Sequence, residues 1–271
     1  MSEIAAKDIE KIVSTSQKRS LETDEADFKC KMLKHSDNHL LLGSGDSWYE
    51  RNFFTSNEAQ SILDELNEQV EFLPRDTFKF KIFGQINLLP RDKAFYGDVH
   101  EKDGSYPLYR YEASKDAEYP QVKQWTPVLQ RLRNILLEKT GQRCNHLVVN
   151  QYRNNNDHIG YHVDKTRDFV QNASVLTLSF GEKRLFRLKN IRTKEIQELR
   201  LDSGSLFVLG PKTNSEWKHS IIKSGKLCGR RVSLTYRTIK TIKHKDGTLT
   251  ETDSKGHLTD GTSEDGKVKE E

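Results

Sequence analysis

The sequence predicts an α+β domain that is mainly β, with two helices packed on one sheet of a barrel or sandwich. Helical periodicity of apolar residues occurs twice before Gly141, whereas short runs of β-branched and aromatic residues follow it. A third observation excludes proteins that cross a membrane with helices. No run approaches the roughly 18 to 20 apolar residues that a membrane-spanning helix needs.

The two helices are predicted from their ends as well as from their apolar faces. Thr55 and Glu58 form the pattern of a capping box, and apolar residues at helical spacing extend the first helix over residues 56–70. The second helix is predicted between Pro127 and Gly141, because proline favours the first turn of a helix and glycine its C-terminal cap. Each helix therefore has one apolar face that can cover a sheet.

The strands are predicted from seven short runs rich in β-branched and aromatic residues. Glycine, asparagine, lysine and proline separate these runs, as is typical of turns between strands. The predicted strands are residues 145–152, 174–180, 184–189, 196–201, 205–209, 217–222 and 231–239.

The ends of the chain differ from its middle in composition. Residues 1–40 are polar and mixed in charge, which predicts a flexible arm. Residues 241–271 offer little to bury, which predicts a disordered tail and leaves one domain at residues 41–240. The three cysteines form no Cys-x-x-Cys pair, so a reducing compartment is expected. We expect a monomer in the nucleus, with the cytoplasm as a second location, and no membrane partner.

The charge is also uneven along the chain. The formal charge is +4, but residues 1–40 and 238–271 are net acidic, at −1 and −2, so residues 41–237 carry +7. This surplus favours an anionic partner, although mildly basic solvated surfaces are common.

One candidate metal site follows from residue spacing. In an extended segment His162 and Asp164 point to the same face, and His219 offers a third ligand. Two histidines and one carboxylate form the facial triad of non-haem Fe(II) oxygenases. Because the chain has nine histidines, the pair alone is a weak signal, and a surface histidine beside a turn aspartate is the alternative.

A second signal comes from the segment spanning residues 231–237. Strand geometry places Arg231, Ser233 and Arg237 on one face and apolar residues on the other. Two inward-facing arginines are costly to bury unpaired, and a dicarboxylate such as 2-oxoglutarate would pair with them bidentately. An edge strand with both arginines in water is the alternative.

Several motifs occur in a characteristic order between Phe83 and Arg237. They are Phe83-Gly84, Leu89-Pro90-Arg91, Tyr96-Gly97-Asp98, Asn150-Gln151-Tyr152-Arg153, the segment from Asp157 to Asp164, Ser179-Phe180-Gly181, Arg184-Leu185-Phe186, Gly204-Ser205-Leu206, Trp217-Lys218-His219-Ser220 and the 231–237 strand. This order resembles the AlkB family of Fe(II)/2-oxoglutarate-dependent dealkylating dioxygenases, most closely its animal and plant homologues that repair alkylated DNA.

The resemblance implies a fold, cofactors and a reaction. The fold is a double-stranded β-helix, or jelly roll, with helices against one sheet. The cofactor is Fe(II), with 2-oxoglutarate and O₂ as cosubstrates. The implied reaction is oxidative removal of N-alkyl groups from 1-methyladenine and 3-methylcytosine in DNA, with RNA as a further substrate, and it releases succinate, CO₂ and formaldehyde.

The resemblance also assigns roles to individual residues. The iron ligands and catalytic residues would be His162, Asp164 and His219. The distal carboxylate of 2-oxoglutarate would contact Arg231 and Tyr152, and its metal-proximal end Arg237 and Asn150. Ser233 stands where the family has an asparagine, and its hydroxyl would be a substitute contact to 2-oxoglutarate.

Substrate contacts are predicted as well. Phe83 matches an aromatic finger that wedges into duplex DNA, and Tyr109 or Tyr111 would stack on a flipped base; ordinary packing is the alternative for all three. Candidate phosphate contacts are Lys81, Arg91, Lys93, Arg184, Lys223, Lys226 and Arg230.

Departures from the family pattern keep other functions open. Lys165 and Thr166 replace an acidic pair that follows the metal aspartate in repair-type relatives, so base recognition is expected to differ. One alternative is a 2-oxoglutarate-dependent hydroxylase of a small molecule or protein. The other is a non-catalytic nucleic-acid-binding module, which the complete set of candidate ligands disfavours.

Overall fold

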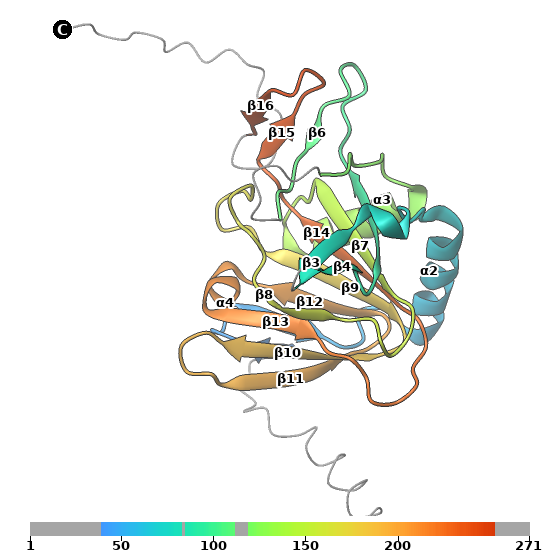
Figure 1. Ribbon diagram of the computed structural model, residues 1–271, viewed down its shortest axis with the longest axis vertical. Helices are drawn as coiled ribbons and strands as arrows, with labels where there is room; N and C mark the ends of the chain where they lie inside the picture. Colours follow the sequence, from blue (N-terminus) through green and yellow to red (C-terminus); the bar gives the residue numbers. More distant parts are fainter. Residues whose placement is uncertain (1–38, 83–84, 112–118, 253–271) are drawn as a thin grey trace, which may run out of the picture.

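The computed structural model describes residues 39–82, 85–111 and 119–252, and two facing antiparallel sheets dominate it (Figure 1). The larger sheet contains, in spatial order, β1 (Leu40–Leu42), β2 (Ser47–Glu50), β12 (Ser205–Leu209), β9 (Val175–Gly181), β14 (Arg231–Arg237), β7 (His146–Tyr152) and β5 (Asp92–Gly97). The smaller sheet contains β11 (Ile196–Leu201), β10 (Arg184–Asn190), β13 (Trp217–Ile221) and β8 (Ile159–His162). This arrangement confirms the predicted jelly roll.

Shorter elements complete the fold. Strand β3 (Lys79–Ile82) pairs antiparallel with β4 (Gln85–Leu88), and a 3₁₀ turn covers Arg75–Thr77. A third sheet contains β6 (Tyr106–Pro107), β15 (Thr241–Lys243) and β16 (Leu249–Glu251). The helices are α2 (Ser56–Gln69), α3 (Pro127–Thr140) and the short α4 (Pro211–Glu216). No helix in the described part of the chain is long and apolar enough to cross a membrane.

The two long helices begin and end as the sequence predicts. The Thr55 hydroxyl accepts a hydrogen bond from the Glu58 amide at 3.3 Å, while the Glu58 carboxylate accepts one from the Thr55 amide at 2.8 Å. Helix α3 starts at Pro127 and ends at Thr140, and its C-cap is Gly141, whose φ of 70° is the left-handed conformation that glycine tolerates.

Helices α2 and α3 cover the side of the larger sheet that faces away from the smaller sheet (Figure 1). Ile62 and Leu132 from the helices pack in one buried cluster with Val232, Leu234 and Tyr236 of β14. The remaining residues of β14 face the other sheet, so the predicted division of this strand into an apolar and an arginine face is confirmed.

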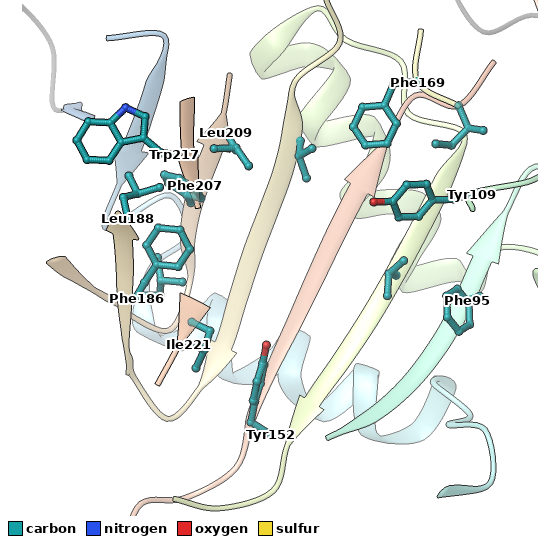
Figure 2. Packing of buried hydrophobic residues seen from close by; sticks show 14 of the residues in the cluster. Phe95, Tyr109, Tyr152, Phe169, Phe186, Leu188, Phe207, Leu209, Trp217 and Ile221 are labelled. Carbon is teal, nitrogen blue, oxygen red and sulfur yellow. The ribbon is translucent and has the colours of Figure 1, made fainter. Parts of the chain in front are cut away.

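The space between the sheets is filled mainly by aromatic and aliphatic side chains. Figure 2 shows Phe186 and Leu188 from the smaller sheet on one side, with Tyr109 and Phe169 on the other and Tyr152 toward one end. All five are at least nine-tenths buried. This apolar interior excludes water from the polar groups that lie among it.

The seven predicted strands are all present, with ends that differ by at most two residues. The predicted tail is wrong for residues 241–252, because β15 and β16 lie there. Thr241 and Ile242 are each 4% exposed, and the Thr241 hydroxyl donates to Asp168 at 2.8 Å. Pairing with the distant strand β6 orders this segment. The 1–38 part of the arm and residues 253–271 of the tail lie outside the described residues.

Arg184, predicted as a phosphate contact, lies inside the protein, so that prediction is wrong. It is 2% exposed, and its guanidinium donates to the carbonyls of Asn154 at 3.0 Å, Asp157 at 2.7 Å and Ile222 at 2.8 Å. These bonds tie the loop before β8 to the segment after β13. Arg184 therefore fixes the loop that leads to the candidate metal site.

We expect Arg184→Met to lower the free energy of unfolding by about 3 kcal/mol, because it leaves three carbonyls without their charged donor. Urea denaturation measures this change. The matched control is Arg187→Met on the same strand, where the lost ion pair with Glu198 is partly exposed and contributes less than about 1 kcal/mol. Equal losses in the two variants would contradict the role of Arg184.

Candidate active site

A cavity of about 800 Å³ opens between the two sheets. Its walls come from β5, β7 and β14 of the larger sheet and from β8 and β13 of the smaller one. The volume lies within the usual range of small-molecule sites, roughly 300 to 1,000 Å³. It can therefore hold a cosubstrate together with part of a second molecule.

The three predicted metal ligands meet at this cavity. His162 ends β8, His219 lies opposite it on the paired strand β13, and Asp164 follows His162 by two residues. One ligand atom from each residue lies within 4.8 Å of the other two. These atoms are close enough to bind one ion, and two imidazoles with one carboxylate suit Fe(II).

Asp164 is held in place by contacts on both its side chain and its backbone. Arg237 donates from Nη2 to Oδ2 of Asp164 at 2.8 Å, which leaves Oδ1 toward His162 at 4.0 Å. The side chain of Asn214, on α4, accepts from the Asp164 amide and donates to its carbonyl, both at 2.9 Å. The carboxylate is therefore oriented before any metal binds.

Burial and neighbouring charges set the protonation state of the ligands. Burial, with the nearby His162 and Arg237, lowers the pKa of His219 to about 3, and burial also lowers the pKa of His162. Burial alone would raise the pKa of Asp164, but Arg237 and both histidines lower it to about 2. At neutral pH the imidazoles are uncharged and the carboxylate is ionised, which are the states that bind a metal ion.

Arg231 lines the same cavity. It is 1% exposed, donates from Nη2 to the Ser179 hydroxyl at 2.8 Å, and its guanidinium lies 5.2 Å from the centre of the Tyr152 ring. Its Nε and Nη1 have no hydrogen-bond partner among the described residues. Burial lowers the pKa of Arg231 to about 10, so it stays charged at neutral pH. A buried cation with two unpaired donors favours a carboxylate ligand.

Asn150 and Ser233 lie opposite each other on the paired strands β7 and β14, and Ser233 stands between Arg231 and Arg237 along β14. Both line the cavity, and Asn150 accepts a hydrogen bond from Arg91 at 3.1 Å. Arg237, the predicted contact to the metal-proximal end of 2-oxoglutarate, is paired with Asp164, while its buried Nε lacks a partner in the described part of the chain.

The structure separates the predicted substrate contacts into two groups. Tyr109, Tyr111 and Arg91 line the cavity, and Tyr109 is buried, with its hydroxyl accepting from the Lys165 amide at 3.2 Å. Lys226 is exposed on the loop between β13 and β14, outside the cavity. Phe83 lies outside the described residues.

Sequence reasoning did not place two residues, Lys93 and Asn214, at this site. Lys93 was predicted to contact phosphate, but it is only 6% exposed and lines the cavity, so that prediction is wrong. Asn214 was missed. Its contact with Asp164 joins residues 50 positions apart, and only its closeness to His219 in the sequence could have drawn attention to it.

Comparison with known proteins places this site in a family. Residues 47–237 match the 2OG-Fe(II) oxygenase superfamily. The chain is 35% identical over 219 residues to mouse "DNA oxidative demethylase ALKBH2", covering 78% of this chain and 87% of that one. The human protein of the same name is 33% identical, covering 70% and 72%. Human "Alpha-ketoglutarate-dependent dioxygenase alkB homolog 3" is 29% identical, covering 69% and 64%.

The family match at residues 47–237 spans both walls of the cavity and includes all three metal-binding candidates, so the resemblance and the geometry agree. The family uses Fe(II), 2-oxoglutarate and O₂, which suits the His-Asp-His group. The chain belongs to the AlkB family of Fe(II)/2-oxoglutarate-dependent dioxygenases.

Proposed function

We propose that this protein oxidatively removes alkyl groups from N-alkylated bases in DNA. The predicted lesions are 1-methyladenine and 3-methylcytosine, with RNA as a further substrate. The observation that carries the proposal is the meeting of a His-Asp-His triad and a buried, incompletely paired arginine in one cavity. Relatives that share most of the chain bear the name DNA oxidative demethylase, which supports DNA as the substrate.

The cofactors fit the residues that line the cavity. His162, Asp164 and His219 would bind Fe(II). Arg231 and Tyr152 would bind the distal carboxylate of 2-oxoglutarate, while Asn150, Ser233 and Arg237 would contact its metal-proximal end. When bound, iron and 2-oxoglutarate activate O₂ for hydroxylation of the N-alkyl carbon, and succinate, CO₂ and formaldehyde are released.

The protein supplies position and surroundings for this chemistry. Arg237 keeps the Asp164 carboxylate ionised and fixes the oxygen that faces away from His162. Arg231 is held by Ser179 and the Tyr152 ring, so a carboxylate would bind to a guanidinium that is already oriented. The apolar side chains between the sheets exclude water from both groups.

The base would enter beside Tyr111, which lines the cavity together with Arg91 and His158. A base inside a duplex must leave its stack to reach an enclosed site, and an aromatic side chain can stack on the extruded base. Outside the cavity, exposed Lys223 and Lys226 lie on the loop between β13 and β14 and would contact phosphate. Arg230 is less available, since it is hydrogen-bonded to Asn67 and Gln151.

A second candidate function is hydroxylation of a small molecule or protein, which Lys165 beside the metal ligand favours. A non-catalytic binding module has less support, because the structure assembles the candidate ligands in their metal-binding protonation states. Monomeric state and nuclear location stay predictions.

The direct test supplies Fe(II), 2-oxoglutarate and O₂ with matched single- and double-stranded oligonucleotides that carry 1-methyladenine or 3-methylcytosine. We expect succinate release together with loss of the methyl mass from the base. Succinate release without demethylation would contradict the DNA substrate and favour the second candidate. If binding to the oligonucleotides does not weaken as the salt concentration rises, the prediction of phosphate contacts is also contradicted.

We expect His162→Ala to weaken Fe(II) binding by more than about 100-fold, because loss of even an outer-sphere partner costs 10- to 100-fold. Turnover should be lost with it. Anaerobic titration with Fe(II) measures the affinity, and thermal unfolding checks that the variant is folded. His158→Ala is the matched control, since His158 lines the cavity but is not in the ligand group. Retained metal binding in His162→Ala would show that the triad is misassigned.

For Arg231→Met we expect the KM for 2-oxoglutarate to rise about tenfold to a hundredfold. A hydrogen bond to a charged group contributes about 1.5 to 3 kcal/mol, and this variant removes both the charge and the donors. Succinate production at varied 2-oxoglutarate gives the KM. Arg231→Lys keeps the charge but lacks the forked guanidinium, so its KM for 2-oxoglutarate should lie between those of the wild type and Arg231→Met. An unchanged KM in both variants would place 2-oxoglutarate elsewhere.

A further inference from the structure

Two aromatic side chains of the cavity come from one short segment that follows β6. Tyr109 and Tyr111 line the cavity, and their ring centres lie 5.8 Å apart. The Tyr109 hydroxyl accepts a hydrogen bond from the Lys165 amide at 3.2 Å, and the Tyr109 ring centre lies 4.7 Å from the Arg237 guanidinium. Tyr109 therefore contacts both the residue that follows Asp164 and the arginine that pairs with Asp164.

Asp168 anchors the backbone of this segment. It is fully buried, and its Oδ2 accepts a hydrogen bond from the Arg110 amide at 2.8 Å. The Arg110 guanidinium also donates to it, from Nε to Oδ1 at 3.0 Å. Burial alone would raise the pKa of Asp168, but the bonds from Arg110 and Thr241 lower it, so the carboxylate is ionised at neutral pH. A buried carboxylate is tolerated only when it is paired, so each of these donors matters.

Another donor to Asp168 comes from the C-terminal extension, which we define as residues 238–252. The Thr241 hydroxyl donates to Oδ1 of Asp168 at 2.8 Å, and the Lys240 amide donates to the Asp168 carbonyl at 2.7 Å. The Thr241 carbonyl accepts a hydrogen bond from the Leu108 amide, also at 2.8 Å. Strand β15 of the extension pairs with β6, and Figure 1 shows β6, β15 and β16 together at one end of the two large sheets.

The backbone and the side chains of the segment have different partners. The amides of Leu108 and Arg110 bind the extension and Asp168, whereas the side chains of Tyr109 and Tyr111 line the cavity. Neither Asp168 nor any residue of the extension lines the cavity itself. Their influence on a bound substrate would therefore pass through the two tyrosines. A segment that is already held in place loses less conformational freedom when a ligand binds to it.

The extension lies beyond residues 47–237, which match the family. We propose that Asp168 and the extension position Tyr109 and Tyr111 against the substrate base, so that residues outside the matched domain contribute to substrate binding. This inference rests on the proposed function, because it requires a base that stacks in the cavity. Asp168 and Thr241 are positioning residues, since they act through the tyrosines.

The test compares two substitutions of the same kind in the extension. Thr241→Val removes the hydroxyl that donates to Asp168, whereas the control Thr238→Val removes a hydroxyl that donates to the Arg143 carbonyl at 2.7 Å. Thr241 and Thr238 are 4% and 3% exposed, so the two substitutions are matched in burial. Arg110→Met is a second test variant, and because the Arg110 side chain is 28% exposed, its loss is compatible with folding.

Amide hydrogen exchange in the full chain measures the anchoring without any substrate. In Thr241→Val and Arg110→Met, the amides at positions 108 and 110 should exchange about tenfold faster than in the wild type, the order that corresponds to one lost hydrogen bond to a charged group. Amides of β9 are the internal reference for global unfolding. Thr238→Val should leave the exchange at positions 108 and 110 unchanged.

Steady-state kinetics measures the effect on the substrate, with a single-stranded oligonucleotide that carries 1-methyladenine or 3-methylcytosine. Both test variants should raise the KM for the oligonucleotide about threefold to tenfold, because the tyrosines are held less firmly. They should also release more succinate for each base that is demethylated. The KM for 2-oxoglutarate should not change, since Arg231 and Tyr152 have no hydrogen bond to the extension among the described residues. A merely structural role would lower the amount of folded enzyme and leave both KM values unchanged.

The outcomes separate this inference from the proposed function. If the wild type demethylates the oligonucleotide, unchanged exchange at positions 108 and 110 or an unchanged KM for the oligonucleotide in both test variants would overturn the inference alone. Equal effects of Thr241→Val and Thr238→Val would do the same. If the wild type demethylates neither lesion, the proposed function and the substrate role of the extension are overturned together.

Discussion

The ion pair between Asp164 and Arg237 joins the two sheets at the candidate metal site. Asp164 follows β8 of the smaller sheet, Arg237 ends β14 of the larger one, and each side chain is 7% exposed. Burying two charges is costly, and it is tolerated only when each charge is paired and further hydrogen-bonded. Asn214 adds two bonds to the backbone of Asp164. The metal-binding geometry therefore depends on a contact that also holds the sheets together.

Arg237 can reach Asp164 because the two faces of strand β14 differ, one being apolar and the other facing the cavity. Tyr236 points into the helix-covered cluster, whereas Arg231 and Arg237 face the cavity. Pairing with β7 places Arg231 opposite Tyr152 and Ser233 opposite Asn150. A slip of one residue would turn the arginines into the apolar cluster beneath α2 and α3, and the buried faces therefore fix the register.

Local signals made much of this structure predictable. The capping box of Thr55 and Glu58 and the alternation along residues 231–237 are short-range patterns, and the structure contains both. The domain was predicted to end at residue 240, short of β15, because the order of this strand depends on pairing with β6 and on the bond from Thr241 to Asp168. The candidate site shows the same contrast between local patterns, which were predictable, and long-range contacts, which were not. The motif residues meet as predicted, whereas the positions of Lys93 and Arg184 follow from contacts that a single sequence does not reveal.

The distribution of buried charge bears on the nucleic-acid partner. Among the described residues, the buried cations are Lys93, Arg184, Arg231 and Arg237, and the buried carboxylates are Asp92, Asp157, Asp164 and Asp168. The two groups are equal in number, so the interior does not use up the +7 of residues 41–237. Among the residues whose burial is described, the surplus therefore belongs to side chains that are at least partly exposed. Such charges attract phosphate from about one Debye length, roughly 8 Å at physiological salt, without reading sequence. Recognition of the lesion must then come from the cavity.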